Sequence, residues 1–288
     1  MNKFLPFVLG AGALAASLAG GAARAQTPAV NPMPDGSRDM YVGLGVQSAP
    51  RYEGTGSRKV SALPVLQVEW SNGVFISGMS AGMHLSNSPT VEYGPLLALK
   101  PGRDATGSGR EIGGFGFVGS LPIAGENLRT APSGLGGMDE IGARLQAGGF
   151  YNLYLSPQWR LTSSLLAGAG RDHDGARLEL GVQRLALAAG ERHRVSLSAG
   201  LGIVNRQYNA TYFGVTEEEA RRSRFSAYAP GGGVQDIQLG ARWHWTLTPS
   251  WMLTSNLQAK RLLGDARHSP LAERPTNLTV STAIAYRF

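Results

Sequence analysis

The feature that most constrains this chain is a period of two in its hydrophobic residues, clearest in the segment that ends at Phe288. One face of this segment carries Leu278, Val280, Thr282, Ile284, Tyr286 and Phe288. The other face carries Asn277, Thr279, Ser281, Ala283, Ala285 and Arg287. Because successive side chains of a β-strand point to opposite sides, the pattern predicts a strand with one apolar face and one small or polar face.

The same alternation recurs in the segments 250–263, 233–247, 193–205 and 175–189. Each is at least as long as the roughly 9–11 residues that a tilted strand needs to cross a bilayer. Strands of soluble sandwiches usually have only about five or six residues. In the last of these segments the phase slips at Leu185 and Leu187, which predicts a β-bulge.

The composition fits a wall that faces lipid on one side and a polar interior on the other. The chain has 40 Gly and only 16% charged residues. After the first 25 residues no apolar run approaches the ~18 residues of a transmembrane helix. We therefore expect an all-β fold, a transmembrane antiparallel up-and-down β-barrel of the Gram-negative outer membrane, with small residues filling a narrow interior.

Parity suggests twelve strands, because an even number returns the chain to the side from which it started. The eleven clear strands are 39–47, 60–70, 73–85, 90–100, 139–150, 157–170, 175–189, 193–205, 233–247, 250–263 and 276–288. We take the Gly-rich segment 111–119 as the twelfth. Tight turns then lie on the periplasmic side, and long loops at 49–58, 121–137, 206–232 and 264–275 lie outside.

Aromatic residues lie beside the tight turns, as in the interfacial girdles of membrane barrels. Trp70, Trp159, Trp245 and Trp251 are expected to form the periplasmic girdle. The terminal Phe288 is the kind of signal that outer-membrane assembly recognises. Its removal is expected to impair insertion first and any later function second.

The first 25 residues are expected to be a cleaved signal peptide. Lys3 precedes a short apolar run, and Ala23-Arg24-Ala25 supplies a small-x-small cleavage site. Residues 26–38 would then be a short periplasmic segment, and 39–288 the barrel. The chain has no Cys, which argues against a lipid-anchored lipoprotein and, weakly, against a disulfide-bonded secreted domain.

The net charge of +7 comes from arginines that are scattered along the chain, so we do not infer nucleic-acid binding. Outer-membrane lipid, including the anionic lipopolysaccharide, is the expected neighbour of rim charges. Four bases fall on predicted inner faces: Arg194, Arg242, Lys260 and Arg287. They suggest one possible function, a pore for small solutes or antibiotics.

An enzyme is the weakest of the alternatives. His84 and Ser86 would share a strand face in a His-x-Ser-Asn stretch similar to that of outer-membrane phospholipases, where imidazole could activate the hydroxyl. The further Tyr-Thr-Gln element of those enzymes is missing, and Ser88 stands where they have Gly. We therefore expect no catalytic residues and attribute the stretch to chance at a strand end.

Metal and cofactor sites are not expected either. Residues 171–175, Arg-Asp-His-Asp-Gly, offer too few ligands for a hard cation and are better explained as a turn. His193, His244 and His268 lie on separate segments without ligand spacing. No Gly-rich segment links a strand to a helix, so a phosphate-binding loop is not expected.

Three stretches resemble the MipA/OmpV family of outer-membrane proteins. They are QSAPRYEGTGSRKVSALPVLQVEW near the start, YNATYFGVTEEEA followed by SRFSAYAPGGG, and KRLLGDARHSPLAERPTNLTVSTAIAYRF at the end. They lie in the expected order and span nearly the whole chain after residue 25. The segment 105–138, rich in Gly, Ser and Pro, departs from the family pattern, so no family expectation extends to it.

The resemblance implies an outer-membrane barrel. It also implies a non-enzymatic scaffold or envelope protein that interacts with a membrane-bound lytic transglycosylase and a bifunctional peptidoglycan synthase. Other members are described as osmotic-stress or adhesion proteins. Members differ in such roles, so the fold transfers more safely than the partner.

The long loop 206–232 also has a structural interpretation. Tyr212, Phe213 and Gly214 would begin a segment that folds back over the barrel mouth, with Gly231 to Gly233 as a hinge. Glu217 to Glu219 and the arginines 221, 222 and 224 suggest a short helical turn with charge pairs three or four residues apart. We favour this interpretation over a ligand site.

Overall fold

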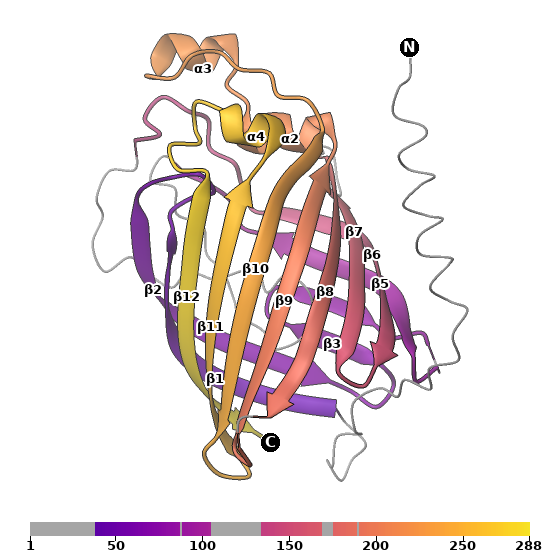
Figure 1. Ribbon diagram of the computed structural model, residues 1–288. Coiled ribbons are helices and arrows are strands. Elements are labelled where there is room, and N and C mark those ends of the chain that lie inside the picture. The colour runs from indigo at the N-terminus through magenta and orange to yellow at the C-terminus, as the bar shows by residue number, and fades with distance from the viewer. Residues whose placement is uncertain (1–37, 87, 105–133, 169–174, 189) are drawn as a thin grey trace.

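A computed structural model of the protein describes residues 38–86, 88–104, 134–168, 175–188 and 190–288. Its strands form one closed antiparallel barrel in which neighbours in sequence are neighbours in space and β1 pairs with β12 (Figure 1). The strands are β1 (Arg38–Pro50), β2 (Arg58–Glu69), β3 (Val74–Ser77), β4 (Ser80–Met83), β5 (Val91–Lys100), β6 (Arg144–Ser156), β7 (Trp159–Gly168), β8 (Ala176–Ala188), β9 (His193–Val204), β10 (Gly233–Thr246), β11 (Trp251–Leu262) and β12 (Thr276–Arg287). The described helices are α2 (Arg206–Phe213), α3 (Glu217–Arg222) and α4 (Gly264–His268).

The predicted alternation is confirmed, and burial shows which face is inside. In β12, Leu278 and Ile284 are 43% and 44% exposed, whereas Ala283 and Ala285 are almost fully buried. The register carries the pattern around the wall, since Ile284 lies opposite Leu253 and Leu44. The apolar residues therefore form an outer band that faces lipid.

The seam between β1 and β12 depends on small residues on the inner face. Gly43 and Gly45 of β1 lie opposite Ala285 and Ala283. A Cβ atom added to Gly45 would lie 2.3 Å from the carbonyl oxygen of Thr282. The first and last strands can therefore approach this closely only with glycine there.

The predicted strand count is right, but the predicted twelfth strand is not the one that completes it. The segment 73–85 is two four-residue strands, β3 and β4, joined by a tight turn in which Gly78 has a φ of 60°. β5 pairs directly with β6, so the barrel closes without a strand between them. The segment 111–119 lies outside the described residues, as do residues 1–37 and most of 105–138.

The connections mostly follow the expected division. Turns β2–β3, β6–β7, β8–β9 and β10–β11 lie at the end where β12 finishes, and the loops 51–57, 205–232 and 263–275 lie at the other. The β3–β4 turn is the exception, since it is tight and points towards the loop end. The shift of register between Arg184 and Leu187 confirms the bulge predicted in β8.

The aromatic residues beside the turns take the expected places. Trp70, Trp159 and Trp251 are each about two-fifths exposed at ends of their strands, and Trp251 packs edge-on against Tyr286. Phe288, at 49% exposure, follows β12 at the same end, and its N–H donates to Met40. Among the described helices, none is long and apolar enough to cross a bilayer.

Candidate functional site

The extracellular end of the barrel is covered by helices from its two largest described loops. α2 and α3 come from the loop between β9 and β10, and α4 comes from the loop between β11 and β12. Figure 1 shows them above the strands, at the end opposite the chain's C-terminus. We call these three helices and their loops the cap. The prediction that the 206–232 loop folds back over the mouth is confirmed.

α2 is anchored to the barrel by the side chains of its N-cap and of a residue in its middle. Asn205 is its N-cap and accepts hydrogen bonds from the N–H groups of Tyr208 and Ala176, so it joins the helix to β8. The buried Asn209 donates to the carbonyl of Gly231 and accepts from Gln235. Gly231 also donates to Asp265, so the Gly-rich segment is bonded to α2 and to the α4 loop. The hinge proposed for this segment stays a prediction.

α3 begins with a capping box. The hydroxyl of Thr216 accepts from the N–H of Glu219, and the Glu219 carboxylate accepts from the N–H of Thr216. Burial alone would raise the pKa of Glu219, but hydrogen bonds from Thr216 and Asp139 outweigh it and lower this pKa. The carboxylate is therefore kept ionised where it joins α3 to the 134–143 loop.

The prediction of charge pairs within α3 is wrong for the arginines whose partners the structure gives. Arg222 pairs with Asp139, and Arg224 pairs with Glu273 at 2.7 Å. Arg222, the last residue of α3, and Arg224, just after it, contact acids of two other loops. The charges therefore connect loops rather than turns of one helix.

Two hydrophobic clusters consolidate the cap. The larger joins loops that are far apart in sequence and consists of Leu135, Met138, Val215, Phe225 and Leu271. The smaller consists of Phe213, Leu262 and Ala266, all almost completely buried. Phe213 is at the end of α2 and Leu262 is at the end of β11. This second cluster therefore packs the cap against the barrel wall.

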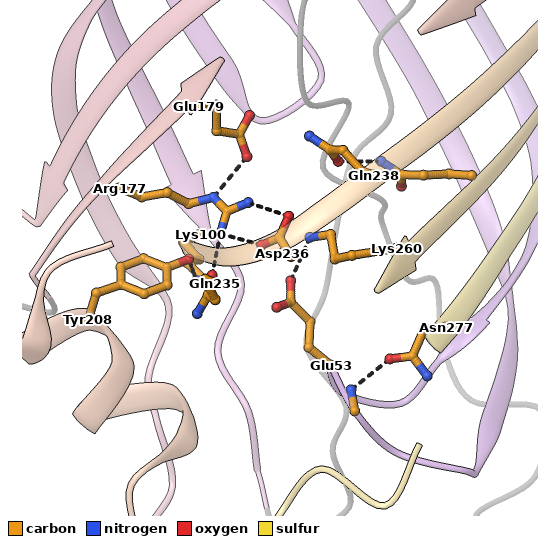
Figure 2. A network of polar contacts seen from close by, with 12 residues as sticks. Glu53, Lys100, Arg177, Glu179, Tyr208, Gln235, Asp236, Gln238, Lys260 and Asn277 are labelled. Atoms are coloured by element: carbon orange, nitrogen blue, oxygen red, sulfur yellow. Dashed lines mark hydrogen bonds and ion pairs between the residues drawn. The ribbon is translucent and has the colours of Figure 1, made fainter. Parts of the chain in front are cut away.

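A buried polar network lies directly beneath the cap (Figure 2). Arg177 of β8 is at its centre, 2.8 Å from Glu179 and 2.8 Å from Asp236 of β10. It also donates to Gln235. The side chain of Asp236 is completely buried. A buried charge of this kind is stable only when it is paired and hydrogen-bonded, as here.

The network extends to the β1–β2 loop through a second ion pair. Lys260 of β11 lies 2.9 Å from Glu53. Burial alone would raise the pKa of Glu53, but the attraction of Lys260, Lys100 and Arg177 outweighs it and lowers this pKa to about 2. Asn277 of β12 fixes the same loop, since it accepts from Gly54 and donates to Thr55.

Lys100 completes the network from the opposite wall. It donates to the hydroxyl of Tyr208, and its ammonium group lies 3.4 Å from the ring centroid of Tyr212. Burial raises the pKa of Tyr208 well above its ordinary value, so this phenol stays protonated. Three bases and three acids thus meet at the mouth: Lys100, Arg177, Lys260, Glu53, Glu179 and Asp236.

Comparison with known proteins places this barrel in a family. Residues 42–288 match the family described as MltA-interacting protein MipA. The chain belongs to the MipA family. The match covers almost the whole barrel, including the cap and its network, so the resemblance inferred from the three sequence stretches is confirmed.

Two named relatives agree with this assignment. The chain is 31% identical over 90 residues to outer membrane protein OmpV of Vibrio cholerae, and equally so to outer membrane protein Omp26La of Vibrio anguillarum. Each match covers 31% of this chain and 34% of the relative, so it spans about a third of the length of these curated relatives. Both are named as outer membrane proteins, and the MipA-family barrel is likewise an outer-membrane protein.

Solved structures with some likeness are also barrels of this membrane. An outer membrane channel of Pseudomonas putida F1 aligns with a TM-score of 0.38 at 11% identity, over 90% of this chain and 98% of that one. The DcaP channel of Acinetobacter baumannii aligns with a TM-score of 0.34 at 7% identity, over 92% and 100%. Likeness this low says nothing about function.

The MipA-family barrel places the four predicted lumen bases on its inner face, but in different surroundings. Lys260 belongs to the network beneath the cap. Arg194 and Arg242 lie further down, on neighbouring strands whose register places Arg242 opposite Ser196 and His244 opposite Arg194. Arg287 is at the periplasmic end of β12. On this lower wall Arg160 lies 3.7 Å from Glu92 and donates to Gln183.

The phospholipase-like stretch is at the periplasmic end of β4. His84 is 3.4 Å from the Glu69 carboxylate, and its ring packs against Phe75 and Phe150. Ser86 lies in the following turn and is partly buried. His84 thus contacts the carboxylate of Glu69 and the rings of Phe75 and Phe150. Sequence spacing did not indicate these contacts.

The histidines considered as metal ligands do not come together. His193 stacks on Trp243 on the outer face, His244 is on the inner face of β10, and His268 ends α4. Within the described residues no group of three or more His, Asp or Glu could hold a metal ion. Of the candidate turn 171–175, residues 171–174 lie outside the part that the structure describes.

Proposed function

We propose that this MipA-family barrel is a non-enzymatic scaffold of the outer membrane, closed to solutes at its outer end, which holds peptidoglycan-remodelling enzymes at its periplasmic turns. The observation that carries the proposal is the cap, fastened to the wall by Phe213 and Leu262 and by the six-charge network. Side chains that neutralise one another are poorly placed to draw a solute inward.

The family description supports the choice of partner. The family is described by its interaction with MltA. The sequence resemblance implies that this partner is a membrane-bound lytic transglycosylase. A barrel closed outside still presents its turns to the periplasm. Exposed turn residues such as Glu191 and Arg192 offer charged contacts there.

Co-purification tests the proposal. The full-length protein, extracted in mild detergent, should retain a purified membrane-bound lytic transglycosylase and a bifunctional peptidoglycan synthase. Replacing Glu191 and Arg192 by Ala changes the periplasmic face, whereas replacing Glu140 and Arg221 makes a matched change outside. Retention no greater than that of an unrelated barrel would refute the scaffold.

A solute or antibiotic pore is the second candidate, because Arg194 and Arg242 keep the lower lumen polar. A pore would require the cap to move. Electrical recording separates the two functions, since a scaffold conducts nothing. Lipid cleavage is a third possibility only if the parent protein hydrolyses phospholipid and replacement of Ser86 by Ala stops it.

The proposed division of the chain is also testable. We propose that residues 1–25 are removed as a signal peptide and that 26–38 precede the barrel in the periplasm. N-terminal sequencing of protein isolated from outer membranes should begin at Gln26. A sequence that begins at Met1 would contradict this.

A further inference from the structure

Two arginines lie on the outer face of the barrel beside its extracellular rim, and a third lies in the adjoining loop. Arg58 of β2 has the same strand parity as the lipid-facing Val60, which is 57% exposed. Arg261 of β11 has the parity of Leu257, which is 46% exposed. Arg274 is in the loop just before β12 and is also exposed. We call these three residues the rim arginines.

A charged residue on the lipid-facing side marks the headgroup level. Such a charge is costly at the bilayer centre but costs little near the interface. Arg58 begins β2 and Arg261 lies next to the last residue of β11. Arg58 and Arg261 therefore lie at the end of the outward-facing apolar band, at the level expected for lipid headgroups.

Arg58 is held in a fixed position across the neighbouring strand. Its guanidinium donates to the Ser48 carbonyl at 2.9 Å and to the Leu278 carbonyl of β12 at 2.6 Å. Pro50, the last residue of β1, has no N–H to offer. The guanidinium of Arg58 thus reaches β12, although its backbone is two strands away.

The other two rim arginines lie around the same part of β12. Arg261 is opposite Thr276 on the adjacent strand, and adjacent strands are about 4.8 Å apart. The N–H of Arg274 donates to Gly54, and a Cβ added to Gly56 would lie 3.2 Å from Arg274 Nε. The start of β12 therefore gathers one arginine from each side and one from above.

Nearby acids are already engaged with other groups. Glu273 accepts from Arg224 through Oε1 and from the N–H of Gly56 through Oε2. Glu53 pairs with Lys260. Within the described residues no carboxylate contacts the guanidinium groups of the rim arginines, whereas Arg222 and Arg224 each contact one and Arg177 contacts two. The rim arginines therefore carry three positive charges that no contacting carboxylate in the described part of the chain offsets.

We propose that the rim arginines bind a phosphorylated glycolipid of the outer leaflet, of the lipopolysaccharide type, through its phosphate groups. Arginine binds phosphate through paired N–H groups, which gives both strength and orientation. Directly below lies an apolar stripe for the acyl chains, formed by Val46, Val60, Leu278 and Val280. Headgroup and chains are thus bound by adjacent parts of one surface. This site does not depend on the scaffold function.

Binding of purified bisphosphorylated lipid A to the full-length, delipidated protein in detergent tests the site. Replacing Arg261 and Arg274 together by Ala should weaken binding at least tenfold and reduce its dependence on salt. Replacing Arg206 and Arg221, two exposed arginines on α2 and α3, should change it less than twofold. Heat-modifiable migration on gels shows that each variant is folded.

Two further probes identify what is recognised. Lipid A without its phosphates should bind at least tenfold more weakly, and inorganic phosphate alone should not compete at millimolar concentration. Equal binding by the phosphate-free lipid would mean recognition by acyl chains only and would overturn the proposal. Equal affinity of the Arg261/Arg274 variant and the Arg206/Arg221 control for lipid A would overturn it as well. So would full competition by free phosphate.

Discussion

The strands of this barrel are connected differently at its two ends. At the extracellular end, side-chain contacts hold the loops together. Two hydrophobic clusters and a six-charge network join loops that are far apart in sequence. At the periplasmic end, backbone turns such as Trp70–Gly73 suffice, with Gly73 at a φ of 84°. The outer end is therefore covered by packed side chains, whereas short turns link the strands at the periplasmic end.

The largest effect is expected from Asp236→Ala. This substitution leaves Arg177 buried with one acid fewer, and breaking a buried pair costs about 3–5 kcal/mol. The cap should become sensitive to protease, and thermal unfolding should shift downward. Glu92→Ala is the matched control, because it removes a lumen carboxylate from the lower wall. If both variants exposed the cap equally, the network would not be what holds it.

Phe213→Ala should loosen the cap next. The side chain is 1% exposed, and truncating a buried Phe costs about 3–5 kcal/mol where the site cannot collapse. Because the cap is a local unit, we expect the loss near the lower end of that range. Hydrogen exchange should increase in α2 and α4 but not in β1 or β12. Increased exchange throughout the wall would show that cap and barrel unfold together.

Thr216→Ala should have a smaller effect. Loss of an N-cap hydroxyl costs about 1 kcal/mol, and α3 should fray without release of the cap. The matched periplasmic change is Thr248→Ala, whose hydroxyl accepts from the N–H of Trp251. Hydrogen exchange of the α3 amides measures the first change. An unchanged α3 would mean that its loop contacts, rather than the capping box, keep it helical.

The smallest effect is expected from mild acid. The pKa of Glu53 is lowered to about 2, below its unfolded value, so the stability this carboxylate contributes is present above the unfolded pKa and is lost as pH falls through about 2. Protease resistance of the cap should therefore be the same at pH 7 and pH 5. Exposure of the cap at pH 5 would contradict the ion pair with Lys260.

The wall was largely predictable from sequence, and the mouth was not. Alternation identified both faces of β12 and the bulge in β8, because side-chain parity is a local property. The β3–β4 hairpin was missed because its turn at Gly78 and Met79 lies within one continuous run of small and apolar residues. The twelfth strand was therefore assigned to 111–119 instead.

The network beneath the cap could not be read from spacing. Glu53, Arg177 and Asp236 come from three distant segments, and only barrel closure brings them together. Three acidic and three basic residues near α3 suggested pairs within that helix, whereas Arg222 and Arg224 pair with other loops. Sequence spacing places His84 beside Ser86, whereas its acid partner Glu69 lies on a different strand, β2.

Planar-bilayer recording of the folded, full-length protein tests the central claim, closure at the outer end, most directly. At neutral pH the parent protein should give no conductance steps, whereas Asp236→Ala should give intermittent ones as the cap loosens. A parent protein that conducts steadily while migrating as a folded barrel would contradict the closed mouth and favour the pore.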